Sequence, residues 1–124
     1  MQSPDLDLAR RQPVWDCLQH VWMDTDVAEL VPHMARVCAD STYSLDELEA
    51  IYWNEVRPAV SRNLFALPAP HWSGYELGAL TERVLRAQRF GRRLPARWLH
   101  PYARRWWDEI ARAIVVVRSG RADA

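Results

Sequence analysis

The clearest hydrophobic pattern in the chain lies within residues 41–65. Ser44 and Glu47 form an S-x-x-E capping box there, in which each side chain binds the backbone N–H of the other residue. Apolar residues then recur at three- and four-residue spacing, as a helix with one buried face requires: Leu45, Leu48, Tyr52, Val56 and Ala59. Pro58 lacks an N–H and crowds the preceding turn. We therefore predict a helix over residues 45–57 that kinks or stops just before this proline.

Two shorter helices are predicted before this one. The first covers residues 13–23, with Pro13 in the first turn, where its missing N–H would be unpaired anyway. Residues 24–26 (DTD) form a polar break. Pro32 lies too deep for an uninterrupted helix that starts at residue 27, so the pattern predicts a loose turn and a new helix near Pro32 that ends at Asp40.

Two longer helices are predicted after the central one. Ser73 is placed to cap a helix over residues 75–90, and Pro101 lies near the start of a helix over residues 99–118. The last helix has the most regular apolar stripe: Leu99, Ala103, Trp106, Ile110, Ile114 and Val117. Gly120 is placed to cap its end.

At 124 residues the chain suits one domain. We predict a single compact all-α domain of about five helices over residues 1–124, with an N-terminal arm at 1–11 and a frayed tail at 119–124.

The net charge of zero conceals an uneven distribution. Residues 1–55 hold eleven acids and three arginines, a net charge of −8, whereas residues 56–124 hold thirteen arginines and five acids, a net charge of +8. Either the two halves pair within the fold, or the molecule presents an acidic face and a basic face to its partners.

The apolar runs are too short to span a bilayer, and the N-terminus lacks the apolar segment of a secretory signal. Cys17 and Cys38 lack C-x-x-C spacing, so we interpret them as two buried thiols in a reducing compartment. The predicted location is the cytoplasm, without membrane contact.

Several segments resemble a family of small uncharacterised bacterial proteins that is known only as a domain of unknown function. The matching segments are RRQPVW at 10–15, DTD at 24–26, STYSLDELEAI at 41–51, EVRP at 55–58, NL at 63–64 and WSGY at 72–75. They cover the first two-thirds of the chain, and the arginine-rich last third adds little. The resemblance implies a stand-alone bacterial helical domain and transfers no catalytic residue. Small bacterial domains of this kind are often immunity proteins. This analogy rests on the general type of protein and not on a shared sequence motif.

Two candidate chemistries have simpler structural explanations. His20, Asp24, Asp26 and His33 could bind a divalent metal, but they are more simply a solvated helix end with capping aspartates. Glu47, Glu49 and Glu55 could supply acid–base groups, yet the capping box already accounts for Glu47. Glu55 adjoins the apolar stripe, which favours a half-buried ion pair with an arginine. The sequence therefore predicts no catalytic residue, no metal site and no cofactor.

The arginines from Arg83 to Arg105 are interleaved with aromatic residues, a composition that can bind nucleic acid: Phe90, Trp98, Trp106 and Trp107. The alternative is internal pairing between these arginines and the acids of the first half. Nucleic-acid binding is accordingly the second hypothesis.

The leading hypothesis is a non-catalytic protein-binding domain, of the kind represented by immunity proteins that neutralise a toxin. Because acidic surfaces suit basic partners, the expected partner is a basic toxin domain. Trp107 lies off the main stripe of its helix, on a line with Ala111 and Val115. This second apolar line indicates either a helix that is buried on both sides or one that packs against a partner or a second copy, so Trp107 is a candidate interface anchor. The residues predicted to bind the partner are Asp24, Asp26, Asp46, Glu49, Asn54 and Trp107. The partner's identity and the oligomeric state do not follow from the sequence.

Overall fold

The structure, a computed structural model, describes residues 6–23, 26–60, 76–89 and 101–122. These residues form helices and contain no strand, which confirms the all-α prediction. In chain order the helices are α1 (Leu8–Leu18), α2 (His20–Met23), α3 (Val27–Asp40), α4 (Leu45–Ile51), the π-helical η2 (Tyr52–Val56), α5 (Arg57–Val60), α6 (Leu77–Arg89) and α7 (Pro101–Ala122).

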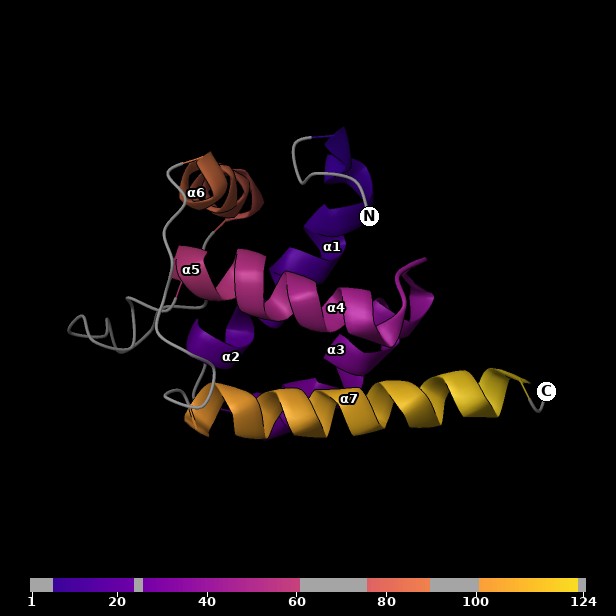
Figure 1. The fold of residues 1–124 in the computed structure, drawn as a ribbon. Coiled ribbons are helices and arrows are strands. Elements are labelled where there is room, and N and C mark those ends of the chain that lie inside the picture. The colour runs from indigo at the N-terminus through magenta and orange to yellow at the C-terminus, as the bar shows by residue number, and fades with distance from the viewer. Residues whose placement is uncertain (1–5, 24–25, 61–75, 90–100, 123–124) are drawn as a thin grey trace.

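The elements α4, η2 and α5 follow one another without a break and form one central helix (Figure 1). This central helix contacts α1 and α6 through η2, and α7 through α4. The most extensive contact between two helices joins α3 and α7, which are far apart in the sequence. The long C-terminal helix α7 runs along one side of the molecule, and α1 and α6 lie on the opposite side of the central helix (Figure 1).

A layer of aromatic rings in contact lies between α2, the central helix and α7. The Tyr52 ring lies 5.0 Å from the Trp22 ring and 5.1 Å from the Trp107 ring, measured between centroids. Its hydroxyl donates to the carbonyl of Ala103 over 2.6 Å, so the buried phenol has a partner. Aliphatic side chains complete the core, among them Leu18, Met34, Leu48, Ile51, Leu80, Val84, Ile110 and Ile114.

The capping box predicted at the start of the central helix is present. The N–H of Glu47 donates to Ser44 Oγ over 3.1 Å, and the N–H of Ser44 donates to Glu47 Oε1 over 2.9 Å. The pKa of Glu47 is lowered, mainly because its carboxylate accepts this backbone bond. Both residues are therefore explained by helix initiation.

Of the two predicted outcomes, a kink or a stop near Val56, the stop does not occur, because the central helix continues through Pro58 to Val60. Pro58 cannot donate a hydrogen bond to the carbonyl of Asn54, four residues earlier. That carbonyl instead accepts a bond of 2.6 Å from the side chain of Gln88 in α6. The chain widens into a π-helix just before the proline, where the N–H of Arg57 binds the carbonyl of Tyr52, five residues back.

The π-helix leaves a second carbonyl for a side chain to bind. In a regular α-helix the N–H of Arg57 would bind the carbonyl of Trp53. Here that carbonyl accepts a bond of 3.2 Å from Nε of Arg57, whose guanidinium also lies over the Trp53 ring. Side chains thus replace the backbone donors that the π-helix and the proline remove.

Removal of the Gln88 amide tests this account of Pro58. Replacing Gln88 by alanine should lower the free energy of unfolding by about 0.5–1 kcal/mol, because the Asn54 carbonyl loses its donor. In a Pro58→Ala background the loss should be smaller, since the N–H restored at residue 58 can bind that carbonyl. A double-mutant cycle measured by urea unfolding gives the coupling energy. Equal losses in both backgrounds would contradict this account.

Two other prolines lie inside helices, so two predicted helix starts are wrong. Helix α1 begins at Leu8 rather than at Pro13, and α3 runs without interruption through Pro32. The carbonyls that lose a donor belong to Ala9 and Ala28, both in exposed residues where water can bind them.

Both ends of the chain are more helical than predicted. Residues 8–11, predicted as part of an arm, belong to α1, and residues 119–122, predicted as part of a frayed tail, belong to α7. Gly120 therefore lies inside a helix and does not cap it. Ser73 lies outside the described residues, and the carboxylate of Glu76 accepts from the N–H of Gly78 at the start of α6.

Candidate functional site

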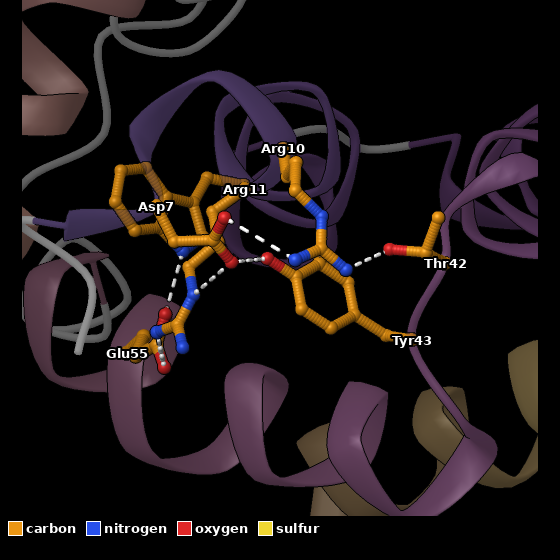
Figure 2. Close-up of polar contacts among 7 residues, drawn as sticks. Asp7, Arg10, Arg11, Thr42, Tyr43 and Glu55 are labelled. Carbon is orange, nitrogen blue, oxygen red and sulfur yellow. Dashed lines mark hydrogen bonds and ion pairs between the residues drawn. The ribbon is translucent and has the colours of Figure 1, made fainter. Parts of the chain in front are cut away.

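The most unusual feature of the interior is a buried ion pair between α1 and η2. Arg11 and Glu55 are almost fully buried, with 1% and 5% of the residue surface exposed. Nη1 of Arg11 donates to Oε2 of Glu55 over 2.5 Å, and the indole N–H of Trp15 donates to Oε1 over 2.9 Å (Figure 2). Both oxygens of the Glu55 carboxylate thus accept a bond from α1.

Helical spacing explains how these groups meet. Arg11 and Trp15 are four residues apart and lie on the same side of α1 as the buried Leu18. Glu55 follows the buried Leu48 by seven residues, which also places it on the inner side of the central helix. The predicted ion pair between Glu55 and an arginine is therefore confirmed, and Arg11 is its partner.

A second carboxylate joins this pair from the residue before α1. Asp7 accepts a hydrogen bond from the hydroxyl of Tyr43, and Nε of Arg11 lies 3.5 Å from the same carboxylate oxygen (Figure 2). Nη1 of Arg10 lies 3.5 Å from the other oxygen. We call Asp7, Arg11, Trp15, Tyr43 and Glu55 the buried network.

The two carboxyl groups of the buried network have pKa values shifted in opposite directions. The pKa of Asp7 is lowered, chiefly by the hydrogen bond from Tyr43 and then by the charges of Arg10 and Arg11, which together outweigh burial. The pKa of Glu55 is raised, because burial disfavours its charged form more than Trp15 and Arg11 favour it.

The arrangement of the buried network suits a structural role. Each carboxylate is bound by donors of the protein itself, and these donors come from α1 and from the segment between α3 and α4. The network therefore joins three segments that are distant in sequence. Sequence reasoning anticipated Glu55 but missed Arg11, Asp7 and Tyr43. The sequence did contain a signal for Arg11, because helical spacing places this charged residue on the same face as the apolar Val14, Trp15 and Leu18.

The Asp7 carboxylate gives a pH-dependent prediction. Replacing Asp7 by asparagine should lower the free energy of unfolding at pH 7 by about 1–2 kcal/mol, because a hydrogen bond to a charged group is lost. Since folding lowers the pKa of Asp7 below 3.8, its contribution is present above that pH and disappears as the pH falls through the folded value. Urea unfolding between pH 7 and pH 2.5 should show the two proteins converging. The exposed replacement Asp108→Asn should change stability by less than about 0.5 kcal/mol, and a pH-independent loss for Asp7→Asn would contradict the assignment.

The residues predicted to bind a partner are only partly brought together. Asp46 is exposed and Glu49 is half-buried one turn later on α4, while Asn54 is exposed in η2. Asp26 is exposed just before α3, and Asp24 lies outside the described residues. We call Asp46, Glu49 and Asn54 the acidic face of the central helix.

Trp107, predicted as an interface anchor, is instead a core residue. It is 4% exposed, and its ring packs against Tyr52. Its neighbour Trp106, which the stripe placed inward, is only half-buried, and the guanidinium of Arg105 lies 5.2 Å from its ring centroid. The inward side of α7 is centred on Ala103, Trp107, Ile110 and Ile114, so it is rotated toward Trp107 relative to the predicted stripe.

Several arginines of the second half bind the first half of the chain. Nη2 of Arg118 lies 3.1 Å from the carbonyl of Cys38 and 2.7 Å from that of Tyr43, so it caps the end of α3. Arg121 forms an ion pair of 2.6 Å with Asp40, and Nε of Arg83 donates to a carbonyl of α5 over 2.9 Å. Arginines in these places stabilise the fold. Phe90 and Trp98 lie outside the described residues.

The candidate metal ligands and the cysteines give no assembled site in the described part of the chain. No group of three or more His, Cys, Asp and Glu residues there could hold a metal ion, and His33 is exposed on α3. Cys17 and Cys38 are buried free thiols. Their contact across α1 and α3, together with burial, raises the pKa of Cys17 well above its usual value, which makes the thiol unreactive.

Within the described ranges, no helix is both long enough and apolar enough to cross a bilayer. Fold and interior together define a small all-α domain that is held together by a buried ion-pair network. The chain belongs to the family described as "Domain of unknown function (DUF7079)", which matches residues 9–115. The match extends into the arginine-rich third, beyond the segments that carried the resemblance in sequence. No curated protein and no solved structure matches the chain.

Proposed function

We propose that the protein is a non-catalytic protein-binding domain that captures a basic partner through the acidic face of the central helix. By the analogy of kind drawn above, the partner is a toxin domain and the protein is its immunity protein in the bacterial cytoplasm. The buried network carries the proposal, because the carboxylates that could support chemistry are bound to donors of the protein itself.

The exposed carboxylate of Asp46 carries the proposed contact. The capping box accounts for Glu47, whereas Asp46 is exposed and, within the described residues, takes part in no ion pair. Glu49 adds a second carboxylate one turn later on the same helix. Carboxylates on a rigid helix suit a partner surface rich in lysine and arginine, and the attraction speeds association more than it slows dissociation.

The partner can be sought in the protein encoded by the adjacent gene, purified in an inactive form. Charge reversal by Asp46→Arg together with Glu49→Arg should lower the association rate constant at least about tenfold at low salt, and the difference should shrink at high salt. The matched control reverses two exposed acids elsewhere, Glu82→Arg with Asp108→Arg, and should leave the rate nearly unchanged. Equal rates for both double variants would refute the proposed surface.

A second candidate function is nucleic-acid binding through the start of α7. Tyr102 is exposed there, its ring makes an edge contact with Trp106, and the neighbouring Arg105 stacks on Trp106. Arginines beside accessible aromatic rings can bind phosphates and stack on bases. This function predicts that a single-stranded oligonucleotide binds at low salt and that the affinity falls steeply as salt rises. Absence of binding at low salt, measured by fluorescence anisotropy, would eliminate it.

A further inference from the structure

A groove lies between α1 and the C-terminal end of α3. Its volume is about 380 Å³, and it is open to solvent. Half of the lining residues are apolar, among them Ala9 and Pro13 from α1 and Val37 from α3, and the other half are charged or polar. No sequence pattern predicted this groove, because it forms where two helices that are separated along the chain diverge.

Two opposite charges stand on the walls of the groove, and the fold holds each of them in place. Arg10 on the α1 wall donates to the hydroxyl of Thr42, and its guanidinium lies 5.0 Å from the ring centroid of Tyr43 (Figure 2). Asp40 on the other wall is bound through Oδ1 to Arg121 of α7. The Oδ2 atom of Asp40 is left to accept a bond from another molecule.

We propose that the groove receives one apolar side chain of a protein partner, with a basic residue beside it that binds Asp40. The inference rests on the proposed function and specifies the chemistry of the partner's contact residues. The groove is open to solvent, whereas small-molecule sites bury most of the ligand's surface. It suits a side chain that is already attached to a protein surface, and buried apolar anchors of this kind supply much of the binding energy at interfaces.

The position of the groove relative to the acidic face supports the same partner. Thr42 and Asp46 are four residues apart, so at most about 14 Å separates them along the chain. A partner that binds the carboxylates of α4 therefore reaches the groove as well. In such a complex the acidic face attracts the partner, and the groove fixes its register.

Capped tetrapeptides of known sequence can test the groove without the natural partner. The peptide acetyl-Gly-Leu-Arg-Gly-amide should bind the full chain and shift the amide resonances of Ala9, Val37 and Thr42 in a proton–nitrogen NMR titration. Replacing the peptide's arginine by glutamine should weaken binding about twofold to fivefold, as loss of one exposed ion pair does. Replacing its leucine by serine should weaken binding about tenfold or more, because the apolar contact is lost.

Matched protein variants locate the binding. Ala9→Trp fills the groove from an exposed position and should abolish the shifts, whereas Ala28→Trp, exposed on α3 outside the groove, should leave them intact. Asp40→Asn should remove the preference for arginine over glutamine in the peptide, and Asp108→Asn should retain it.

Each outcome is decisive for the groove. Persistent binding by the Ala9→Trp variant, shifts confined to other surfaces, or equal affinity for the leucine and serine peptides would overturn the inference. If the peptides bind as expected while charge reversal at Asp46 and Glu49 leaves partner association unchanged, the proposed function fails and the groove stands.

Discussion

Replacing Arg11 by methionine is expected to lower the free energy of unfolding by about 3–5 kcal/mol at pH 7, because it leaves the Glu55 carboxylate charged and without its cation in the interior. Methionine keeps most of the apolar stem of arginine, so the loss reports the charge and not the volume. The size of the effect follows from burial, since the same pair at the surface would contribute less than about 1 kcal/mol. Urea unfolding monitored by tryptophan fluorescence measures it.

Two further variants separate the ion pair from general disruption. In the double variant Arg11→Met with Glu55→Gln, most of the stability should return, because no charge is left unpaired and the glutamine oxygen still accepts from Trp15. The control Arg112→Met removes an arginine whose side chain is 76% exposed and should change stability by less than about 0.5 kcal/mol.

The pH dependence of the single variant provides an independent check. Burial already raises the pKa of Glu55, and removal of Arg11 should raise it further. A group whose pKa is higher in the folded state favours folding as the pH falls, because the folded state then binds the proton more readily. The deficit of Arg11→Met relative to the natural protein should therefore shrink between pH 7 and pH 5. A loss below about 1 kcal/mol, or one independent of pH, would refute the structural role of the pair.

Replacement of Trp107 by alanine is expected to cost about 3–5 kcal/mol, because the change opens a cavity beside Tyr52 in the aromatic layer. The neighbouring replacement Trp106→Ala should cost less, about 1–2 kcal/mol, because that side chain is only half-buried. Thermal and urea unfolding of the two variants give the comparison. A larger loss at Trp106 than at Trp107 would mean that α7 is rotated relative to the arrangement described.

The contrast between these two tryptophans shows which parts of the fold the sequence could predict. Local signals sufficed for the capping box at Ser44 and for the existence of the main helices, because both depend on residues within a few turns of each other. The inward face of α7 could not be predicted in the same way. The orientation of α7 about its own axis depends on its contacts with α3 and with the central helix, both of which are distant from it in sequence.

The prolines show a second limit of local reasoning. Pro58 was expected to kink or end the central helix, since its own turn offers no donor for the carbonyl it leaves unpaired. The donor comes from Gln88, which is 34 residues away from Asn54 in sequence. A proline rule that considers one helix at a time cannot include a side chain from another helix.

The candidate site, like the fold, was predicted where it depends on one helix and missed where it depends on how two helices pack. Exposure of Asp46 and Asn54 followed from their place opposite the apolar stripe, and Glu55 was expected to pair with an arginine. The identity of that arginine depended on how α1 crosses η2, which no spacing within either helix determines. The groove at Arg10 and Asp40 was missed for the same reason.

The contacts of Arg118 bear on the order in which the protein can fold during synthesis. This guanidinium binds carbonyls of Cys38, Ser41 and Tyr43, which precede it by 75 to 80 residues. While Arg118 is enclosed in the ribosomal exit tunnel, the carbonyls at the corner between α3 and α4 can be bound only by water. This corner therefore cannot be completed before Arg118 has left the tunnel. We expect nascent chains arrested before residue 118 to be cleaved by proteases at residues 40–44, and released chains that include Arg118 to resist cleavage there.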